Sequence, residues 1–327
     1  MQNQTLDTPD AGVVRDFPLA PNRANLTLRA LADAYMAAYS GRDRSRVYTT
    51  AFWVNELGER RITDISADDV ADVLDRLAAT PVTKYAGKDP ATGKKILREF
   101  GRRKPATINR LKSVVSGMLT FAQRRRLMPR GWQNPCREIV TEKVRNARTR
   151  FLSPDERERL LKVCRVSKWP RLYLLVLMAL VTGARRGELL ALRYEDLDLE
   201  AGTAHLRMTK NGQERVLPLT PAVIAEIRRF GKAKPEALLF ESVRRPGQPM
   251  KMSKFFNEAV HTAKVQDFHF HDLRHSCASY LAQSGATLLE IADVLGHKTL
   301  DMVRRYSHLT VQHKAALVSR VLGNIGK

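Results

Sequence analysis

One segment near the end of the chain, residues 268–308, constrains the fold more than any other stretch. It reads F-H-F-H-D-L-R-H-S and continues through two glycines to L-G-H-K and R-R-Y-S-H. Gly285 and Gly296 stand where glycines end helices, and Thr287 opens the capping-box pattern T-x-x-E between them. The segment therefore predicts short helices joined by tight turns, which bring several histidines, arginines and a tyrosine close together.

Helical periodicity accounts for most of the remaining chain. In the first part, apolar residues recur at helical spacing over residues 27–39, 47–57, 66–77 and 106–126. In the second part, helices are expected at 154–166, 171–182, from 185, and at 221–231, 252–264, 271–284, 288–295 and 299–306. Two short strands are expected on either side of the turn K-N-G-Q, at 203–208 and 214–218. The pattern predicts a mainly α protein with a small β-hairpin or sheet.

Breaks in this pattern divide the chain into five parts. We expect a flexible N-terminal arm, a helical domain, a charged linker, a second domain and a C-terminal tail, over residues 1–25, 26–137, 138–152, 153–309 and 310–327. The second domain opens with S-P-D-E, which combines an N-cap, a proline at the first helical position and a capping-box glutamate. The tail carries apolar residues at helical spacing, and we expect it to dock on a neighbouring protomer.

The charge of the chain indicates a polyanionic partner. Its 56 Lys and Arg against 34 Asp and Glu leave a net charge of +22. Fourteen of the basic residues, against two acidic ones, lie between Lys84 and Arg130. A surplus of this size favours nucleic acid over a merely solvated surface, because each phosphate contact releases counterions. Residues 84–104 are rich in glycine and proline, and we expect them to form a flexible basic loop.

The residues expected to contact DNA lie in this loop and in the helix that follows it. They are Lys84, Lys94, Lys95, Arg102, Arg103, Lys104, Arg110, Lys112, Arg124 and Arg125. Such contacts position a protein on a duplex and do not by themselves read its sequence.

Other features of the sequence argue against secretion and membrane insertion. The three cysteines, Cys136, Cys164 and Cys277, are too few and too far apart for a disulfide framework or a Cys-x-x-Cys site. The polar N-terminus does not read as a signal peptide. The longest apolar run, residues 172–181, is shorter than the ~20 residues that a membrane span needs. We expect a cytoplasmic, nucleoid-associated protein without a membrane partner.

Two stretches before residue 268 could carry chemistry. In V-T-G-A-R-R-G-E a turn glycine precedes a helix start, and a guanidinium fork suits the oxygens of a phosphate. These residues leave open whether Arg185 or Arg186 has that role, or whether an arginine simply pairs with Glu188 on the surface. Lys210, in the hairpin turn, is either solvated or a mobile general acid whose pKa neighbouring arginines lower.

The pattern H-D-L-R-H allows two interpretations. His271 and Arg274 are three residues apart and therefore share one helical face. His271 and His275 have the spacing of a zinc helix, but Asp272 replaces the glutamate of H-E-x-x-H and Arg274 adds positive charge. We therefore expect no metal site here.

The last pair, His297 and Tyr306, lies beyond a predicted helix end. Tyr306 is either an amphipathic surface residue or a nucleophile, and the second role needs nearby positive charge or a general base. The acidic residues 195–200 lack the glycine and glutamate of a calcium loop, and we expect an exposed turn.

The order of these residues along the chain and the motifs that surround them resemble the tyrosine recombinase (phage integrase) family. The matching stretches within residues 153–309 are T-G-A-R-R-G-E-L-L-A-L-R-Y-E-D-L-D, T-K-N-G-Q-E-R-V-L-P-L, H-D-L-R-H-S-C-A-S and L-G-H-K-T-L-D-M-V-R-R-Y-S-H. The helical residues 27–135 are similar to that family's core-type DNA-binding domain. The resemblance selects Arg185 over Arg186, because the family's arginine directly follows T-G-x.

The resemblance implies a site-specific recombinase that works in a C-shaped clamp on DNA. The implied catalytic residues are Arg185, Lys210, His271, Arg274, His297 and Tyr306, with Glu188 in support. Tyr306 would attack the scissile phosphate, which leaves a 3′-phosphotyrosine and a free 5′-hydroxyl. Arg185 and Arg274 would neutralise the charge that develops on the phosphate.

The resemblance also implies roles for the other three residues. His271 would accept the tyrosine proton, Lys210 would protonate the 5′-oxygen, and His297 would donate a hydrogen bond to the phosphate. One ester replaces another, so no cofactor, metal or ATP is implied. The implied partners are double-stranded DNA recombination sites, three further copies of the chain in a tetramer that passes through a Holliday junction, and accessory or directionality proteins.

Two other functions stay open on the residues alone. The spacing within residues 288–306 is also that of a helix-turn-helix in a DNA-binding regulator, although that function leaves Arg185, Lys210 and Tyr306 without a role. A type IB topoisomerase would use similar chemistry to relax DNA, but it would not join strands from two duplexes.

Overall fold

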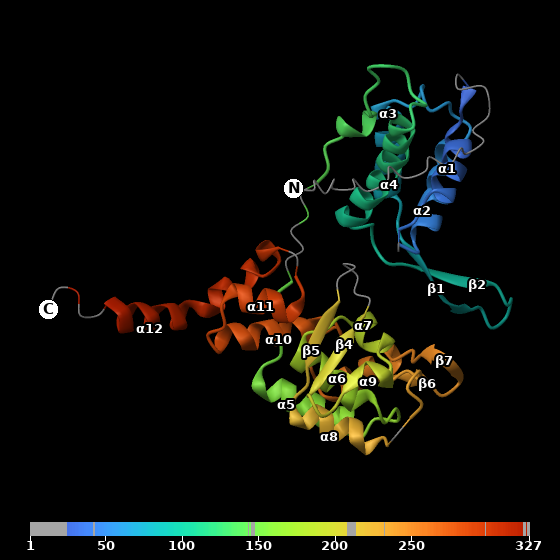
Figure 1. Ribbon diagram of the computed structural model, residues 1–327. Helices are drawn as coiled ribbons and strands as arrows, with labels where there is room; N and C mark the ends of the chain where they lie inside the picture. Colours follow the sequence, from blue (N-terminus) through green and yellow to red (C-terminus); the bar gives the residue numbers. More distant parts are fainter. Residues whose placement is uncertain are drawn as a thin grey trace, which may run out of the picture. The chain divides into compact units, whose positions relative to one another are not determined.

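The computed structural model describes residues 25–327 except for 42, 143, 145–147, 208–213, 232, 298, 323–324 and 326–327. The chain divides into two units, Met1–Arg145 and Asn146–Lys327 (Figure 1), and each unit has its own hydrophobic core. The expected N-terminal arm lies outside the described residues except for Asn25.

Four α-helices build the described part of the first unit, α1 (Leu28–Ala37), α2 (Arg46–Leu57), α3 (Ala67–Ala79) and α4 (Pro105–Arg124). Their apolar faces meet around Trp53, which is fully buried and donates its indole N–H to the carbonyl of Leu111 at 2.9 Å. The start of α3 is a capping box, in which Ser66 and Asp69 each accept a hydrogen bond from the other's backbone N–H. The residues that predicted these helices are thus the residues that pack their core.

An antiparallel hairpin of β1 (Thr83–Lys88) and β2 (Lys95–Glu99) joins α3 to α4 (Figure 1). The prediction of a flexible loop over residues 84–104 is wrong for this stretch. Asp89 orders the turn, because its carboxylate accepts hydrogen bonds from two amide groups at 2.8 and 2.9 Å. Gly93 adopts a positive φ of 67° there, so this glycine serves a tight turn and does not mark a loose chain.

The second unit is also mainly helical. Its α-helices are α5 (Pro154–Arg165), α6 (Leu172–Thr182), α7 (Arg186–Ala191), α8 (Pro221–Arg229), α9 (Ser253–Thr262), α10 (Asp272–Gln283), α11 (Leu288–Leu295) and α12 (Val311–Leu322). Nearly every residue of α6 is buried, which explains why this helix is apolar on all sides. Helices α5, α8 and α10 pack against α6 or its neighbours and complete the core of the unit.

Small antiparallel sheets complete the second unit. One has the order β3 (Leu197–Asp198), β4 (Thr203–Leu206) and β5 (Arg215–Pro218), and the other pairs β6 (Glu241–Ser242) with β7 (Arg245–Pro249). The mainly α fold with small sheets agrees with the prediction. The turn that holds Lys210 lies outside the described residues.

Residues 299–306 do not form the single α-helix that periodicity predicted. They form 3₁₀ helices at Leu300–Met302 and Arg304–Thr310. Val303 and Tyr306 are both buried, and their spacing of three matches the 3₁₀ repeat, which stacks such residues on one line. Helix α12 follows and extends from the rest of its unit (Figure 1). Within the described chain, none of the helices has both the length and the apolar character to cross a membrane.

The start of α5 offers a test of the capping signal. Ser153 Oγ accepts from the Glu156 N–H at 3.1 Å, and the Glu156 carboxylate accepts from the Ser153 N–H at 3.0 Å. Ser153→Ala should therefore lower the free energy of unfolding by about 1 kcal/mol. Denaturant unfolding measures this loss, and Ser40→Ala at an exposed serine outside the helices serves as the control, with an expected change within about 0.5 kcal/mol. Equal losses in both variants would contradict the role of the cap.

Candidate active site

The beginning of α10 forms one wall of a pocket of about 430 Å³. The residues that line it come from the end of the linker, from α10, from the segment after α11 and from the 3₁₀ helices: Arg148, His269, His271, Asp272, Arg274, His275, His297, Met302, Arg305 and Tyr306. Four of the predicted catalytic residues are in this set. Arg185 lines an adjoining pocket of about 490 Å³, which shares His269 and His271 with the first.

The turn after α6 holds the guanidinium of Arg274. Gly183 ends α6 with a positive φ of 59°, and its carbonyl accepts a hydrogen bond from Arg274 Nη1 at 2.7 Å. A Cβ at Gly183 would come within 2.3 Å of the Leu295 side chain and 3.3 Å of Cys277 Sγ. Both the backbone angle and the space therefore require glycine, and the close packing sets the position of Arg274.

A buried carboxylate organises two further arginines. Glu188 accepts from the Arg185 backbone N–H at 2.9 Å and pairs with Arg185 Nη1 at 2.7 Å. The oxygen that accepts from the backbone N–H also lies 3.4 Å from Nη2 of Arg215, and Nη1 of Arg215 donates to the carbonyl of Val294 at 2.9 Å. No role was predicted for Arg215, since its position in a short strand carried no distinguishing signal.

The pocket is strongly electropositive. Burial, together with the charges of Arg185 and Arg215, lowers the pKa of Arg274 to about 10. The group stays protonated at neutral pH, so the guanidinium groups of Arg185, Arg215 and Arg274 act on one region, with the Glu188 carboxylate between the first two. Such an arrangement favours a bound anion, because an anion offsets the repulsion among the cations.

Two buried nitrogen atoms in the pocket have no hydrogen-bond partner within the described residues. They are Nη2 of Arg274 and Nδ1 of His297. A buried polar group without a partner is costly, and in native proteins it commonly marks a place that a ligand completes. Both atoms belong to residues that the sequence analysis assigned to a phosphate.

The hydroxyl of Tyr306 contacts a histidine other than the one expected. His275 Nδ1 lies 2.5 Å from Tyr306 Oη, whereas His271 packs edge-on against the ring of His275 with ring centroids 5.2 Å apart. From the sequence, His275 was considered only as a zinc ligand. Its spacing of four from His271 did place both rings on one helical face, but it did not show which ring meets the tyrosine.

Burial controls the protonation of these groups. It lowers the pKa of His275 to about 4 and that of His297 to about 3, with nearby positive charges acting in the same direction. The pKa of His271 is lowered for the same reasons. Burial raises the pKa of Tyr306 to about 12, although Arg305 and Arg274 oppose this rise. Tyr306 is thus a neutral phenol at neutral pH, and its hydroxyl shares a hydrogen bond with the neutral ring of His275.

The end of the linker is anchored beside the pocket. Arg148 makes a two-pronged contact with Asp272, at 3.0 and 2.9 Å, and an ion pair with Asp267 at 2.9 Å. Asp272 is buried and also accepts from the His269 backbone N–H at 2.8 Å. Arg148 therefore helps to set the start of α10, a contact over 124 positions that sequence spacing could not predict.

The basic residues of the first unit that were expected to contact DNA fall into two groups. Arg103 donates to two carbonyls at the end of α3, and Arg110 pairs with Asp43 at 3.0 Å. Lys112 donates to the carbonyl of Ile139 at 2.5 Å. The others have exposed side chains: Lys84, Lys94, Lys95, Arg102, Lys104, Arg124 and Arg125.

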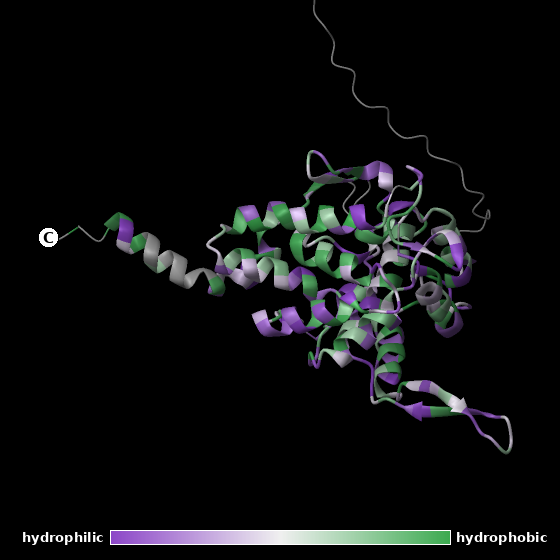
Figure 2. Cartoon of the chain, turned by 90° about the horizontal axis from the view of Figure 1, so that it is seen from below, coloured by the Kyte–Doolittle hydropathy of each residue, from purple (hydrophilic) through white to green (hydrophobic). Residues whose placement is uncertain are grey.

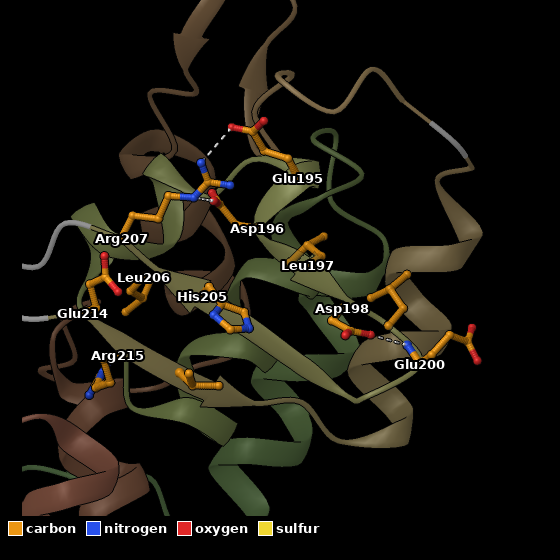
Figure 3. A pocket seen from close by; sticks show the side chains of 12 residues that line it. Glu195, Asp196, Leu197, Asp198, Glu200, His205, Leu206, Arg207, Glu214 and Arg215 are labelled. Atoms are coloured by element: carbon orange, nitrogen blue, oxygen red, sulfur yellow. Dashed lines mark hydrogen bonds and ion pairs between the residues drawn. The ribbon is translucent and has the colours of Figure 1, made fainter.

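A third pocket, of about 930 Å³, lies at the β3–β4–β5 sheet and contains the acidic residues within 195–200 (Figure 3). Figure 3 shows that Arg207 reaches Asp196 and Glu195, and the distances are 2.7 and 3.5 Å. These carboxylates are thus held by an arginine. No group of three His, Cys, Asp or Glu side chains in the described part of the chain is arranged to hold a metal ion.

Comparisons with known proteins identify the family of this chain. The family model described as "Phage integrase family" matches residues 150–313, half of the chain. A shufflon-specific DNA recombinase of Escherichia coli is 32% identical over 251 residues, which cover 76% of this chain. The chain spans 59% of the length of that relative.

Solved structures share the fold. The Tn1549 transposon integrase in complex with a circular intermediate DNA has a TM-score of 0.66 at 18% identity, over 90% of this chain and 100% of that one. A lambda integrase tetramer bound to a Holliday junction has a TM-score of 0.62 at 19% identity, over 86% of this chain and 78% of that one. At these identities the likeness concerns the fold.

The buried carboxylate of Glu188 can be tested by removing its charge. Glu188→Gln leaves Arg185 and Arg215 without their shared negative partner, so it should lower the free energy of unfolding by roughly 3 kcal/mol. Glu195→Gln is the matched control, because its partner Arg207 is well exposed and the loss should stay below about 1 kcal/mol. Denaturant unfolding distinguishes the two, and a loss at Glu188 no larger than the control would contradict the organising role.

The depressed histidine pKa values predict a pH dependence of stability. Between the folded values, about 4 and 3, and the ordinary value of 6.5, the unfolded chain binds more protons than the folded one. Stability should therefore fall as the pH is lowered from about 6.5 towards 4. His275→Asn keeps a polar partner for Tyr306 but does not titrate, so its melting temperature should fall less between pH 6.5 and 5.0.

The exposed residue His308 provides the control for this experiment. Thermal unfolding of His308→Asn should follow the wild-type pH dependence. An unchanged pH dependence in His275→Asn would show that the buried ring does not govern it.

Proposed function

The chain belongs to the phage integrase family, and we propose on this premise that it is a site-specific DNA recombinase that acts through a 3′-phosphotyrosine intermediate. The observation that carries the proposal is the pocket where Arg274, His297 and Tyr306 meet. Its unpartnered donors, Arg274 Nη2 and His297 Nδ1, are the groups that a phosphodiester would satisfy. The recombinase activity named for the relative from Escherichia coli supports the same reaction.

In this reaction the guanidinium groups stabilise the charge that develops on phosphorus. Arg274 is preorganised by the carbonyl of Gly183, and Arg185 by Glu188. Donors that are fixed before the reaction stabilise a transition state strongly, because they do not reorganise when its charge develops. His297, which lines the same pocket, donates a further hydrogen bond to the phosphate.

The proton of the nucleophile needs an acceptor, because the pKa of Tyr306 is raised to about 12. In the DNA-free protein His275 holds the Tyr306 hydroxyl, and Tyr306 is only 2% exposed. We assign His275 the role of a positioning residue that keeps the nucleophile beside the arginines. His271, on the same face of α10, accepts the proton when the phosphate is bound, and Lys210 protonates the 5′-oxygen of the leaving strand.

Tyr306 then carries the 3′-phosphate, and the cleaved strand ends in a free 5′-hydroxyl. Attack by a 5′-hydroxyl from the partner duplex restores a phosphodiester and releases Tyr306. Each step exchanges one phosphate ester for another, so bond energy is conserved and no ATP is consumed. Four such exchanges join two duplexes through a Holliday junction.

The proposed assembly is a homotetramer on double-stranded recombination sites, with the two units of each chain forming a C-shaped clamp. The lambda integrase tetramer on a Holliday junction has the same fold and supports this assembly. Helix α12 presents Val318, Val321 and Leu322 to solvent, an apolar surface for docking on a neighbouring protomer. The exposed basic residues of the first unit contact phosphates, and accessory or directionality proteins set the outcome of the reaction.

The central test is the trapping of the covalent intermediate. On a nicked suicide duplex taken from repeats in the DNA that flanks the gene, the wild-type chain should form a protein–DNA adduct that survives denaturing electrophoresis. Tyr306→Phe should form none, because only the hydroxyl is lost, while DNA binding stays within about twofold of wild type. An adduct that persists in Tyr306→Phe would refute the assignment. A DNA-binding regulator would give no adduct with either protein.

A further inference from the structure

The β1–β2 hairpin of the first unit has no role in the chemistry described above. Nearly all of its residues are exposed, and the hairpin extends away from the helices of its own unit (Figures 1 and 2). A two-stranded hairpin by itself is only marginally stable in water. We therefore ask which binding partner would cover the exposed side chains of the hairpin.

The strand register sorts the side chains of the hairpin onto two faces. Tyr85 lies opposite Leu97, and Lys88 lies opposite Lys95. Positions 95 and 97 are two apart on β2, so both pairs point to the same side. The register shift between Tyr85 and Gly87 makes this possible, because without it positions 85 and 88 would face opposite sides. We call this side the Tyr85–Leu97 face.

The charges of the hairpin favour an anionic partner. The two lysines of the Tyr85–Leu97 face are directly opposed, and so are Lys84 and Arg98 on the other face. Directly opposed like charges destabilise a strand pair. The acidic residues do not offset them, because the Asp89 carboxylate is bonded within the turn and Glu99 lies at the base of the hairpin. An anion along the hairpin would relieve this repulsion.

The apolar side chains indicate which face meets the partner. Tyr85 and Leu97 are 60% and 59% exposed although they lie opposite each other. On the other face, the ring of Phe100 already carries the ammonium group of Lys84, 4.6 Å from its centroid. The Tyr85–Leu97 face thus combines an uncovered apolar pair with two lysines.

We propose that the Tyr85–Leu97 face inserts into the major groove of duplex DNA. That groove admits a two-stranded β-ribbon, and thymine methyl groups on its floor make apolar contacts with side chains. Lys88 and Lys95 lie against the phosphates at the edge of the groove, and Tyr85 and Leu97 lie against base edges. The inference rests on the proposed action on duplex DNA and adds a contact that the catalytic site does not require.

The root of the hairpin is held in a way that suits this role. Val82 and the residues opposite it continue the pairing, with the Val82 N–H donating to the Gly101 carbonyl at 2.7 Å. Arg103 donates to the carbonyls of Leu77 and Thr80 at 3.2 and 3.1 Å, which ties the root to the end of α3. A held root lowers the entropy cost of binding, because the hairpin keeps its direction in the free protein.

Salt titration tests the electrostatic part of the proposal. The probe is a fluorescent 40-base-pair duplex of random sequence, and affinity is measured by anisotropy with the full chain. Lys88→Ala/Lys95→Ala should reduce the slope of log affinity against log salt by about two, since each phosphate contact contributes about 0.9. Lys84→Ala/Arg98→Ala removes an equal charge from the other face and should reduce the slope by only about one, because Lys84 alone of that pair is among the expected phosphate contacts. Equal slopes in the two variants would overturn the choice of face.

Base analogues test the groove. The wild-type chain should bind an alternating A·T duplex about fourfold more tightly than the same duplex with uracil for thymine, the effect of roughly one buried methyl group. Tyr85→Ala/Leu97→Ala should bind both duplexes equally and keep the wild-type salt slope. Tyr48→Ala, at another exposed tyrosine, is the matched control and should still discriminate. If Tyr85→Ala/Leu97→Ala still prefers the thymine duplex as strongly as Tyr48→Ala does, insertion into the major groove is refuted.

Two readouts separate this inference from the proposed function. Thermal unfolding should show that the variants keep the wild-type melting temperature, since their side chains lie outside the Trp53 core.

If the wild-type chain forms the Tyr306 adduct while all hairpin variants bind DNA normally, the inference fails and the proposed function stands. If the variants bind normally but alter the size of the DNA-bound assembly in sedimentation, the hairpin contacts a protomer and the inference is refuted. If the variants weaken binding but the wild type forms no adduct, the proposed function fails alone.

Discussion

The mutual repulsion of buried and half-buried guanidinium groups is the constraint on which the rest of this site depends. Arg185, Arg215 and Arg274 act on one region, and their partial or full removal from water makes this repulsion stronger than it would be in water. The protein opposes it with the buried carboxylate of Glu188 and with backbone carbonyls, of which that of Gly183 is the clearest. The net charge of these three arginines and Glu188 remains positive, so an anion and not a further protein contact would complete the site.

The same electropositive environment governs the nucleophile. Tyr306 is buried against α10 in a small apolar cluster, and burial raises its pKa above that of a free phenol. The nearby arginines oppose the rise without cancelling it. A neutral histidine in contact with the hydroxyl is therefore the arrangement that keeps Tyr306 protonated until a phosphate arrives. His275 fills this position because its ring follows His271 by one helical turn.

Local signals predicted the elements well where one residue or short motif decides the conformation. The capping boxes at Ser66, Ser153 and Thr287 begin helices as expected, and Gly296 ends α11 with a positive φ. Composition was misleading for residues 84–104, where glycine and proline suggested a loose loop. There the alternation of side chains and the turn at Asp89 decide in favour of a hairpin. Periodicity was misleading for residues 299–306, where it predicted an α-helix. There the inward packing of Val303 and Tyr306 selects 3₁₀ geometry.

The sequence by itself determined the helical class of the protein, its net positive charge, and the residue types of the site, because periodicity, charge and motif order are local properties of the chain. Only the tertiary structure decided that His275 and not His271 touches Tyr306, that Arg148 and Arg215 join the site, and that Arg103, Arg110 and Lys112 are engaged within the first unit. Those contacts connect residues as far as 124 positions apart. Their geometry follows from how helices pack around a shared core, and no spacing within one segment encodes it.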